Sequence, residues 1–317
     1  MKTAAVVLQA PQSLGLSQLQ LDAPGEADVI VDIDYSGIST GTEKLLWSGR
    51  MPAFPGMGYP LVPGYESVGR VVAAGPLARH RVGDAVFVPG ARCFGPVRGL
   101  FGGAAARLVV ADERVYDIDP ALGESAVLLA LAATAYHAVS GGGTRSPIVA
   151  PDLIIGHGVL GRLLARLTVA AGLPPPTVWE REALRHDGAH GYAVLHPDAD
   201  PRRDYRAIYD VSGDARILDA AIARLVKGGE VVLAGFYAEP LSFNFAPAFM
   251  REAQIRAAAE WQRPDMLAVK QLVEEGRLDL GDLITHRERA EHASDAYRTA
   301  FSDSACLKMV LDWRSCQ

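Results

Sequence analysis

Residues 151–167 read PDLIIGHGVLGRLLARL, and this stretch decides the fold. An apolar strand ends at Gly156, Gly158 and Gly161 complete a G-x-G-x-x-G pattern, and an apolar helix begins at once. In a dinucleotide-binding turn the first glycine permits the tight turn, the second admits the pyrophosphate and the third lets the helix pack on the strand. The free N–H groups and the dipole of the helix N-terminus favour a diphosphate there. The pattern predicts a dinucleotide site; the alternative is a glycine-rich turn without a ligand.

An acidic residue completes this pattern at the end of the next expected strand. PTVWE, residues 176–180, ends in Glu180, which lies 180 − 156 = 24 positions after Gly156. A carboxylate there accepts hydrogen bonds from both ribose hydroxyls and repels a 2′-phosphate, which favours NAD over NADP. Arg181 and Arg185 follow closely, and they keep NADP open because an arginine can hold the phosphate.

Strands and helices alternate on the C-terminal side of this motif. The pattern predicts a parallel, doubly wound α/β sheet. Strands are expected at 152–156, 176–180, 205–213 and 229–237, and helices at 159–171, between the second and third of these strands, and at 215–225.

The first third of the chain has the texture of β structure. VIVDIDYSGIS, residues 29–39, alternates apolar and polar residues with period two, as a half-buried strand does. Short β-branched runs closed by Gly or Pro follow at 66–76 and 81–90 and suit a small barrel with long loops. A helical pattern covers 124–140 and ends at Gly141–Gly143, and the chain finishes with a polar helix after Trp261 and a strand at 306–313.

Composition excludes several classes of protein. With 317 residues, 49% of them hydrophobic and 21% charged, the chain has enough apolar material for two domains and is not disordered. A net charge of −6 argues against nucleic acid as a partner. Cys93, Cys306 and Cys316 are too few and too scattered for a disulfide framework, which indicates a reducing cytoplasm. Residues 125–144 carry no formal charge, but their polar residues and glycines favour a buried helix over a membrane span.

The order of the expected parts resembles the layout of the medium-chain dehydrogenase/reductase superfamily. A barrel comes first, a dinucleotide-binding unit follows, and a C-terminal segment returns to the barrel. The resemblance implies a GroES-like catalytic domain at 1–124, completed by 262–317, and a Rossmann NAD-binding domain at 125–261, with the active site in the cleft. The stretches that carry it are YSGISTGTE (35–43), LVPGYESVGRVV (61–72), RVGDAVF (81–87), LALAATAYHAV (129–139) and LIIGHGVLG (153–161).

The departures from this superfamily concern its catalytic metal. Zinc alcohol dehydrogenases place a Cys, a His, and a Cys or Glu where this chain has Ser39, Tyr65 and Ala130, and only Glu66 of the metal-binding pattern remains. Serine and alanine cannot replace thiolate or imidazole as zinc ligands. We therefore expect an enzyme without catalytic zinc and without another metal site.

Within the superfamily, the chain is similar to the dehydrogenases of bacteriochlorophyll a synthesis that act on hydroxyethyl bacteriochlorophyllides. This resemblance implies that a ring-attached CH(OH)CH₃ group is oxidised to acetyl, with the hydride passing to NAD. The stretches that carry it are residues 42–69, 99–110, 202–220, 228–237, 248–262 and 306–313.

Without a metal, a side chain must take the proton of the alcohol. Tyr65 occupies a lost ligand position, so we expect it to be the general base, with Lys44 nearby to lower the pKa of its phenol. Ser39 or Thr42 would hydrogen-bond the substrate oxygen, and Glu66 would orient the site or form a buried ion pair. The alternative is that Tyr65 only fills the space of the missing metal.

A large flat pigment needs an apolar pocket. The loop between Ser39 and Tyr65 is rich in aromatic residues and methionines that suit such a ligand, although loop packing or a dimer contact would explain them as well. The expected substrate residues are Trp47, Met51, Phe54, Met57, Tyr59 and His137. A lone histidine on an apolar helix such as His137 is more often a core residue. The expected cofactor residues are Thr134, Gly156, His157, Gly158, Val159, Leu160, Gly161, Glu180, Arg181, Val211, Ser212, Gly213, Gly235 and Phe236.

Two alternative functions stay open. A zinc-free quinone or enoyl reductase is the alternative within the superfamily, and a non-catalytic pigment carrier that senses NAD(H) is the alternative outside it. The expected partners are the chlorin substrate and a second copy of the chain, docked through residues 231–237 or 241–245; neither nucleic acid nor integral membrane contact is expected. The location is expected to be cytoplasmic, including the periphery of the photosynthetic membrane.

Overall fold

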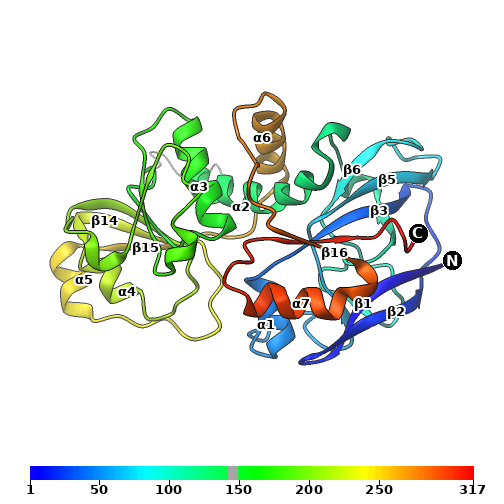
Figure 1. The fold of residues 1–317 in the computed structure, drawn as a ribbon, viewed down its shortest axis with the longest axis horizontal. Helices are drawn as coiled ribbons and strands as arrows, with labels where there is room; N and C mark the ends of the chain where they lie inside the picture. The colour runs from blue at the N-terminus through cyan, green and yellow to red at the C-terminus, as the bar shows by residue number, and fades with distance from the viewer. Residues whose placement is uncertain (142–148) are drawn as a thin grey trace. The chain divides into compact units, whose positions relative to one another are not determined.

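The computed structural model describes residues 1–141 and 149–317, which form two compact units (Figure 1). The first unit contains Met1–Ala130 together with Leu283–Gln317, and the second contains Leu131–Asp282. Both chain ends therefore belong to the first unit, and the second unit is inserted between them.

The unit boundaries differ from the expected 1–124 with 262–317 and 125–261. Residues 262–282 belong to the second unit, because their helix is anchored there by polar contacts. In that segment Asp265 pairs with Nδ1 of His137 at 2.7 Å, and Arg166 donates to the carbonyl of Asp279 at 3.0 Å.

Two sheets build the first unit. The smaller has the strand order β2-β1-β4-β7, and the larger has the order β16-β17-β3-β5-β6-β9, with β8 paired to β3. Its strands are β1 (Lys2–Ala10), β2 (Ser13–Gln20), β3 (Asp28–Ile38), β4 (Leu61–Val62), β5 (Ser67–Ala74), β6 (Ala85–Val88), β7 (Arg98–Gly99), β8 (Arg107–Ala111), β9 (Tyr116–Asp117), β16 (His286–Arg289) and β17 (Met309–Asp312). Its α-helices are α1 (Thr42–Ser48) and α7 (Ala293–Ser302).

The alternation read in residues 29–39 places β3 at the centre of the larger sheet. Val29, Val31 and Ile33 are fully buried, as period-two alternation requires. The C-terminal β17 pairs antiparallel with β3, with Met309 opposite Ile38. In Figure 1 the red C-terminal segment accordingly runs among the blue and cyan strands of the N-terminal part.

The second unit is a six-stranded, all-parallel sheet with the order β12-β11-β10-β13-β14-β15. This order is that of a doubly wound dinucleotide-binding fold, and it reverses between β10 and β13. Its strands are β10 (Leu153–Ile155), β11 (Thr177–Trp179), β12 (Ala193–Leu195), β13 (Tyr205–Asp210), β14 (Leu225–Leu233) and β15 (Gln254–Ala257). Its helices are α3 (Val159–Ala170), α4 (Leu218–Ile222), α5 (Phe245–Arg251) and α6 (Arg263–Glu274), while α2 (Leu129–Ser140) begins in the first unit and continues into the second. The α/β fold class is confirmed.

Two expected helices and one expected dimer contact differ from the structure. Between β11 and β13 the fully described chain forms strand β12 and short 3₁₀ turns instead of an α-helix, and the helix expected at 215–225 is only α4. The dimer contact expected through residues 231–237 does not start from an edge strand. This segment begins in β14, which pairs with both β13 and β15. Among the described residues, β15 pairs only with β14 and so forms that edge of the sheet.

One helical stretch, Pro120–Ser140, is long and apolar enough to cross a membrane by composition alone. Ala126, Leu128 and Ala130 in this stretch are completely buried within the protein, as the sequence predicts for a core helix. The Gly141–Gly143 stop expected after this helix lies partly outside the described residues.

We predict that Gly69→Ala lowers the free energy of unfolding by about 2 kcal/mol. A Cβ at Gly69 in β5 would lie 1.9 Å from the carbonyl oxygen of Asp32 on the paired β3, so backbone must move. Gly15→Ala in β2 is the matched control, because no heavy atom lies within 4 Å of its added Cβ. Urea unfolding of both variants checks this, and equal midpoints would contradict it.

Candidate active site

Three hydroxyl groups meet at the place where the sequence predicts the catalytic residues. Tyr65 donates its phenol proton to Oγ of Ser39 at 2.7 Å. The side chain of Thr42, at the start of α1, lies close enough to the phenol of Tyr65 to offset part of the rise in the pKa of that group. Phe101 packs edge-on against the Tyr65 ring, with ring centroids 5.5 Å apart. The structure therefore brings Ser39, Thr42 and Tyr65 together as a hydroxyl cluster.

This cluster does not suit a zinc ion. At the three positions where zinc relatives carry ligands, Ser39 and Tyr65 hydrogen-bond to each other, and Ala130 is completely buried with no donor atom. A hydroxyl, a phenol and a methyl group do not form a zinc donor set.

The expected effect of Lys44 on Tyr65 is wrong. The ammonium group of Lys44 instead donates to the carbonyl of Phe301 at 2.8 Å. Burial, followed by the nearby carboxylate of Glu66, raises the pKa of the Tyr65 phenol above its usual value of 10. The phenol is therefore neutral at physiological pH and acts as a hydrogen-bonding group rather than as a standing phenolate.

Glu66 lies beneath the cluster in a completely buried ion pair. Its Oε2 accepts from Nζ of Lys308 at 2.7 Å, and Lys308 also donates to the carbonyl of Ile38 at 3.2 Å. Oε1 of Glu66 has no hydrogen-bond partner among the described residues. Gly37 makes room for this acid, because a Cβ there would lie 2.2 Å from Oε2.

A second buried acid, Glu43, stands on α1 next to Thr42. Its Oε1 accepts from the backbone N–H of Ser39 at 3.0 Å, and its Oε2 accepts from the phenol of Tyr297 at 2.7 Å. Burial raises the pKa of Glu43 to about 7 in spite of these two hydrogen bonds. Glu43 therefore joins the segment that carries Ser39 to helix α7.

The expected pigment-binding loop forms a small apolar cluster of its own. Met51 is buried against Leu46, Leu61 and Leu100. The other loop residues are half-buried around this cluster rather than exposed, and Tyr59 donates to the carbonyl of Leu46 at 2.5 Å. They are Trp47, Phe54, Met57 and Tyr59. Packing explains Met51, while the half-buried residues keep apolar surface for a ligand.

His137 does not have the surroundings of a substrate residue. It is buried on α2, and its Nδ1 pairs with Oδ2 of Asp265 at 2.7 Å. Asp265 also accepts from the backbone N–H of Gln262 and so caps the start of α6. These contacts favour the core role that the sequence left open.

The glycine turn has the geometry of a dinucleotide site. Gly156 has a φ of +108°, which favours glycine, and a Cβ on Gly161 would lie 1.9 Å from the carbonyl oxygen of Gly156. Around Gly158 no heavy atom lies within 4 Å of an added Cβ, so this side of the turn is open. Val159 and Leu160 form the first turn of α3, whose N–H groups point toward this opening.

The carboxylate of Glu180 lies at this turn, as its spacing predicts. Its Oε2 accepts from the backbone N–H of His157 at 3.1 Å. Its Oε1 accepts from the N–H groups of Arg181 and Glu182 at 2.7 and 3.0 Å. These donors fix the acid at the end of β11, and its remaining lone pairs are available to ribose hydroxyls.

The backbone N–H of His157, one of the expected cofactor residues, donates to Glu180. Its completely buried ring contacts the carbonyl of Arg185 through Nδ1 at 2.5 Å and the hydroxyl of Tyr192 through Nε2 at 2.9 Å. Burial lowers the pKa of His157 to about 4, so the imidazole is neutral at physiological pH. It fastens the glycine turn to the segment after β11.

Most of the other expected cofactor residues lie near Gly156, at the carboxyl ends of the strands. Val211 donates to the carbonyl of Ile155 at 3.0 Å, directly beside Gly156. Atoms of Val211, Gly213 and Phe236 are the nearest neighbours of the glycines in this region. Thr134 is half-buried on α2, and Arg181 lies 3.9 Å from Asp214 in an exposed ion pair. The remaining members of this group are Ser212 and Gly235.

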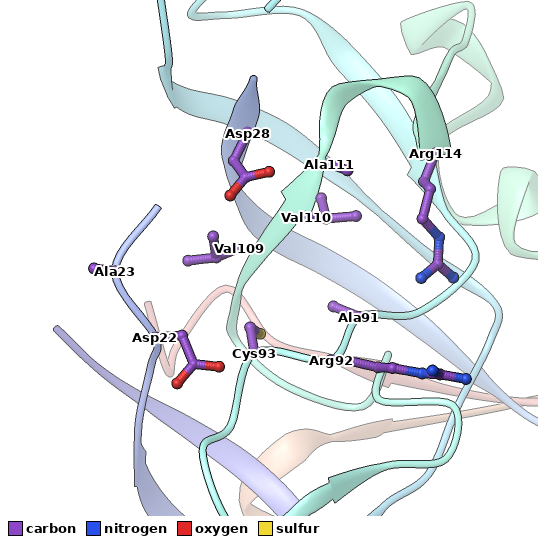
Figure 2. Close-up of a pocket in the computed structure, with 10 residues that line it drawn as sticks. All are labelled: Asp22, Ala23, Asp28, Ala91, Arg92, Cys93, Val109, Val110, Ala111 and Arg114. Atoms are coloured by element: carbon purple, nitrogen blue, oxygen red, sulfur yellow. The ribbon is translucent and has the colours of Figure 1, made fainter. Parts of the chain in front are cut away.

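A surface pocket elsewhere in the first unit contains none of these residues. It has a volume of about 200 Å³, and Figure 2 shows acidic side chains on one side and basic side chains on the other. Its lining includes Asp22, Asp28, Cys93, Arg92 and Arg114. The small volume and the mixed charge do not suit a flat apolar macrocycle.

Sequence reasoning missed three residues next to the predicted cluster: Glu43, Tyr297 and Lys308. Lys308 carries a detectable signal, because a lysine inside the apolar run CLKMVLDW must be paired if it is buried. Glu43 and Tyr297 carry none, since they meet across 254 positions of sequence.

Known proteins resemble the chain over its whole length. Residues 25–120 match the family "Alcohol dehydrogenase GroES-like domain". The chain is 58% identical over 320 residues to the 2-desacetyl-2-hydroxyethyl bacteriochlorophyllide A dehydrogenase of Cereibacter sphaeroides, with 99% of both chains covered. The protein of the same name from Rhodobacter capsulatus is 58% identical over 315 residues, again with 99% of both covered. L-idonate 5-dehydrogenase from Escherichia coli shares the fold, with a TM-score of 0.84, 16% identity and 98% of both chains covered.

We predict that Glu43→Gln removes a pH-dependent penalty on folding. The pKa of Glu43 rises from 4.5 to about 7 on folding, so between these values the folded state holds a proton that the unfolded state has released. Stability is therefore lost as pH rises, by on the order of 3 kcal/mol. Urea unfolding at pH 5 and pH 8 checks this. Between these pH values the free energy of unfolding of the wild type should fall by that amount relative to that of Glu43→Gln. The same difference between the two proteins at both pH values would contradict the prediction.

Proposed function

The chain belongs to the family of the 2-desacetyl-2-hydroxyethyl bacteriochlorophyllide A dehydrogenases, and we propose that it oxidises the hydroxyethyl side chain of a bacteriochlorophyllide to acetyl. It is an oxidoreductase that acts on a CH–OH group in bacteriochlorophyll a biosynthesis. The single observation that carries this proposal is the identity of 58% over 99% of both chains. The hydroxyl cluster and the glycine turn supply a site for each half of the reaction.

A nicotinamide nucleotide, when bound, accepts the hydride that leaves the carbinol carbon. The glycine turn would hold its diphosphate, with Gly158 open to it and Gly161 packed against Gly156. Glu180 would accept from the ribose hydroxyls, and its charge disfavours a 2′-phosphate. These features support NAD over NADP.

The hydroxyl cluster would take the proton of the alcohol without a metal. The oxygen of Tyr65 would accept the substrate proton while its own proton passes along the existing 2.7 Å hydrogen bond to Ser39, whose hydroxyl proton would pass in turn to water. This relay needs no phenolate at rest, which agrees with the raised pKa of the phenol. Ser39 and Thr42 then hold Tyr65 rather than the substrate. The donor set supports a reaction without catalytic zinc.

The apolar loop supports a macrocyclic substrate. Trp47, Phe54, Met57 and Tyr59 are half-buried around one apolar cluster. Aromatic rings and pliable methionines offer area to a flat chlorin at low entropic cost. His137, fixed by Asp265, is left out of this pocket.

The two alternative functions fit the chain less well. Quinone and enoyl reductases of the superfamily prefer NADPH, which Glu180 disfavours. A pigment carrier that senses NAD(H) would use the glycine turn, but it would not need a phenol aligned for proton transfer. We place the enzyme in the cytoplasm, where it would meet its pigment at the membrane periphery, and as a homodimer joined at the open β15 edge.

The test is an anaerobic absorbance scan of the purified protein with a 3-hydroxyethyl chlorin, with and without NAD⁺. Oxidation to acetyl extends the ring conjugation, so the long-wavelength pigment band should move to the red while NADH appears. Both changes should persist after treatment with a strong chelator. Tyr65→Phe should lower kcat at least 100-fold. A pigment shift at protein stoichiometry without NADH would favour the carrier instead.

We predict that Glu180→Gln raises KM for NAD⁺ about tenfold and narrows its preference over NADP⁺, because the repulsive charge is lost. The value of kcat with NAD⁺ should change less than about twofold, since the acid does not touch the reacting atoms. Glu182→Gln is the matched control, because only the backbone N–H of Glu182 contacts Glu180. Steady-state kinetics with both nucleotides check this; an unchanged preference would refute it.

A further inference from the structure

We propose that Glu43 is a positioning residue that holds the hydroxyl cluster of Ser39, Thr42 and Tyr65 in the geometry required for proton transfer. The proposal rests on the proposed function, because it names the residue that aligns the proton relay. Glu43 touches neither substrate nor cofactor residues. It acts through the backbone of Ser39.

The geometry gives Glu43 two anchors on opposite sides. Its Oε1 accepts from the N–H of Ser39, and Ser39 in turn accepts the proton of Tyr65. Its Oε2 accepts from the phenol of Tyr297 on helix α7. Tyr297 is itself fixed, since it is buried and its ring meets Phe301 edge-on at 5.7 Å.

The carboxylate of Glu43 holds the segment between β3 and α1. The N-cap residue of α1, Gly41, supplies no side-chain cap hydrogen bond. Glu43 supplies an acceptor from inside the helix and reaches back to Ser39, four positions earlier. Thr42 lies between these two residues in sequence, so the carboxylate of Glu43 holds the backbone segment that carries both Ser39 and Thr42.

Glu43 acts as a hydrogen-bond acceptor and not as a member of an ion pair. Lys308 and Glu66 lie nearby, but Lys308 is committed to Glu66 at 2.7 Å. Glu43 is left with two neutral donors, Ser39 N–H and Tyr297 O–H. Its role is therefore to accept hydrogen bonds, which a neutral amide oxygen can also do.

Three variants test this. Glu43→Gln keeps an acceptor for the N–H of Ser39 and should retain kcat within about twofold. Glu43→Ala removes both anchors and should lower kcat by about tenfold to 100-fold, with KM for NAD⁺ unchanged within about twofold. Tyr297→Phe removes only the outer anchor and should lower kcat about threefold. A folded Glu43→Ala protein with wild-type kcat, or a Glu43→Gln protein as slow as Glu43→Ala, would overturn the proposal.

A second readout needs no turnover and so separates this proposal from the proposed function. In protein labelled with 3-fluorotyrosine, the ¹⁹F signal of Tyr65 is identified by its loss in Tyr65→Phe. Glu43→Gln should leave this signal in place, and Glu43→Ala should shift or split it. If Glu43→Ala does not fold, Tyr297→Phe should shift it instead. An unmoved Tyr65 signal overturns the inference even in an active enzyme, whereas inactivity of wild type on the chlorin overturns only the function.

Discussion

The first unit depends on one buried ion pair, Glu66 with Lys308. Each charge is almost completely withdrawn from water, and each would be costly to bury alone. Because the partners lie 242 positions apart, the pair fixes the C-terminal segment to the loop that carries Tyr65. It also requires Gly37, whose missing side chain leaves space for the carboxylate. Tyr65 of the hydroxyl cluster directly precedes Glu66 of this pair in the chain.

Fold class and cofactor turn could be predicted because their signals are local. The spacing of Gly156, Gly158 and Gly161 and the acid at Glu180 depend only on one strand, one turn and one helix. The strand order that follows is the usual one for such a motif. The prediction of a helix after β11 was wrong. Residues 181–204 have no hydrophobic periodicity that distinguishes a helix from turns and a short strand.

The candidate active site was only half predictable. Substituted metal positions pointed to Ser39 and Tyr65, and the structure joins them by a hydrogen bond. The partner chosen for Tyr65 was wrong, because proximity in sequence does not tell which way Lys44 points. Glu43 and Tyr297 meet only after the chain has folded, so neither residue could be assigned a role beforehand.

The insertion of the second unit within the first has a consequence for synthesis on the ribosome. Glu66 emerges early, but Lys308 follows only after all of residues 131–282. Until then the N-terminal strands lack β17 beside β3, and a carboxylate destined for the interior has no counter-ion. The nascent barrel must therefore keep this region open to water while the nucleotide-binding unit, whose sheet is continuous in sequence, is free to fold first.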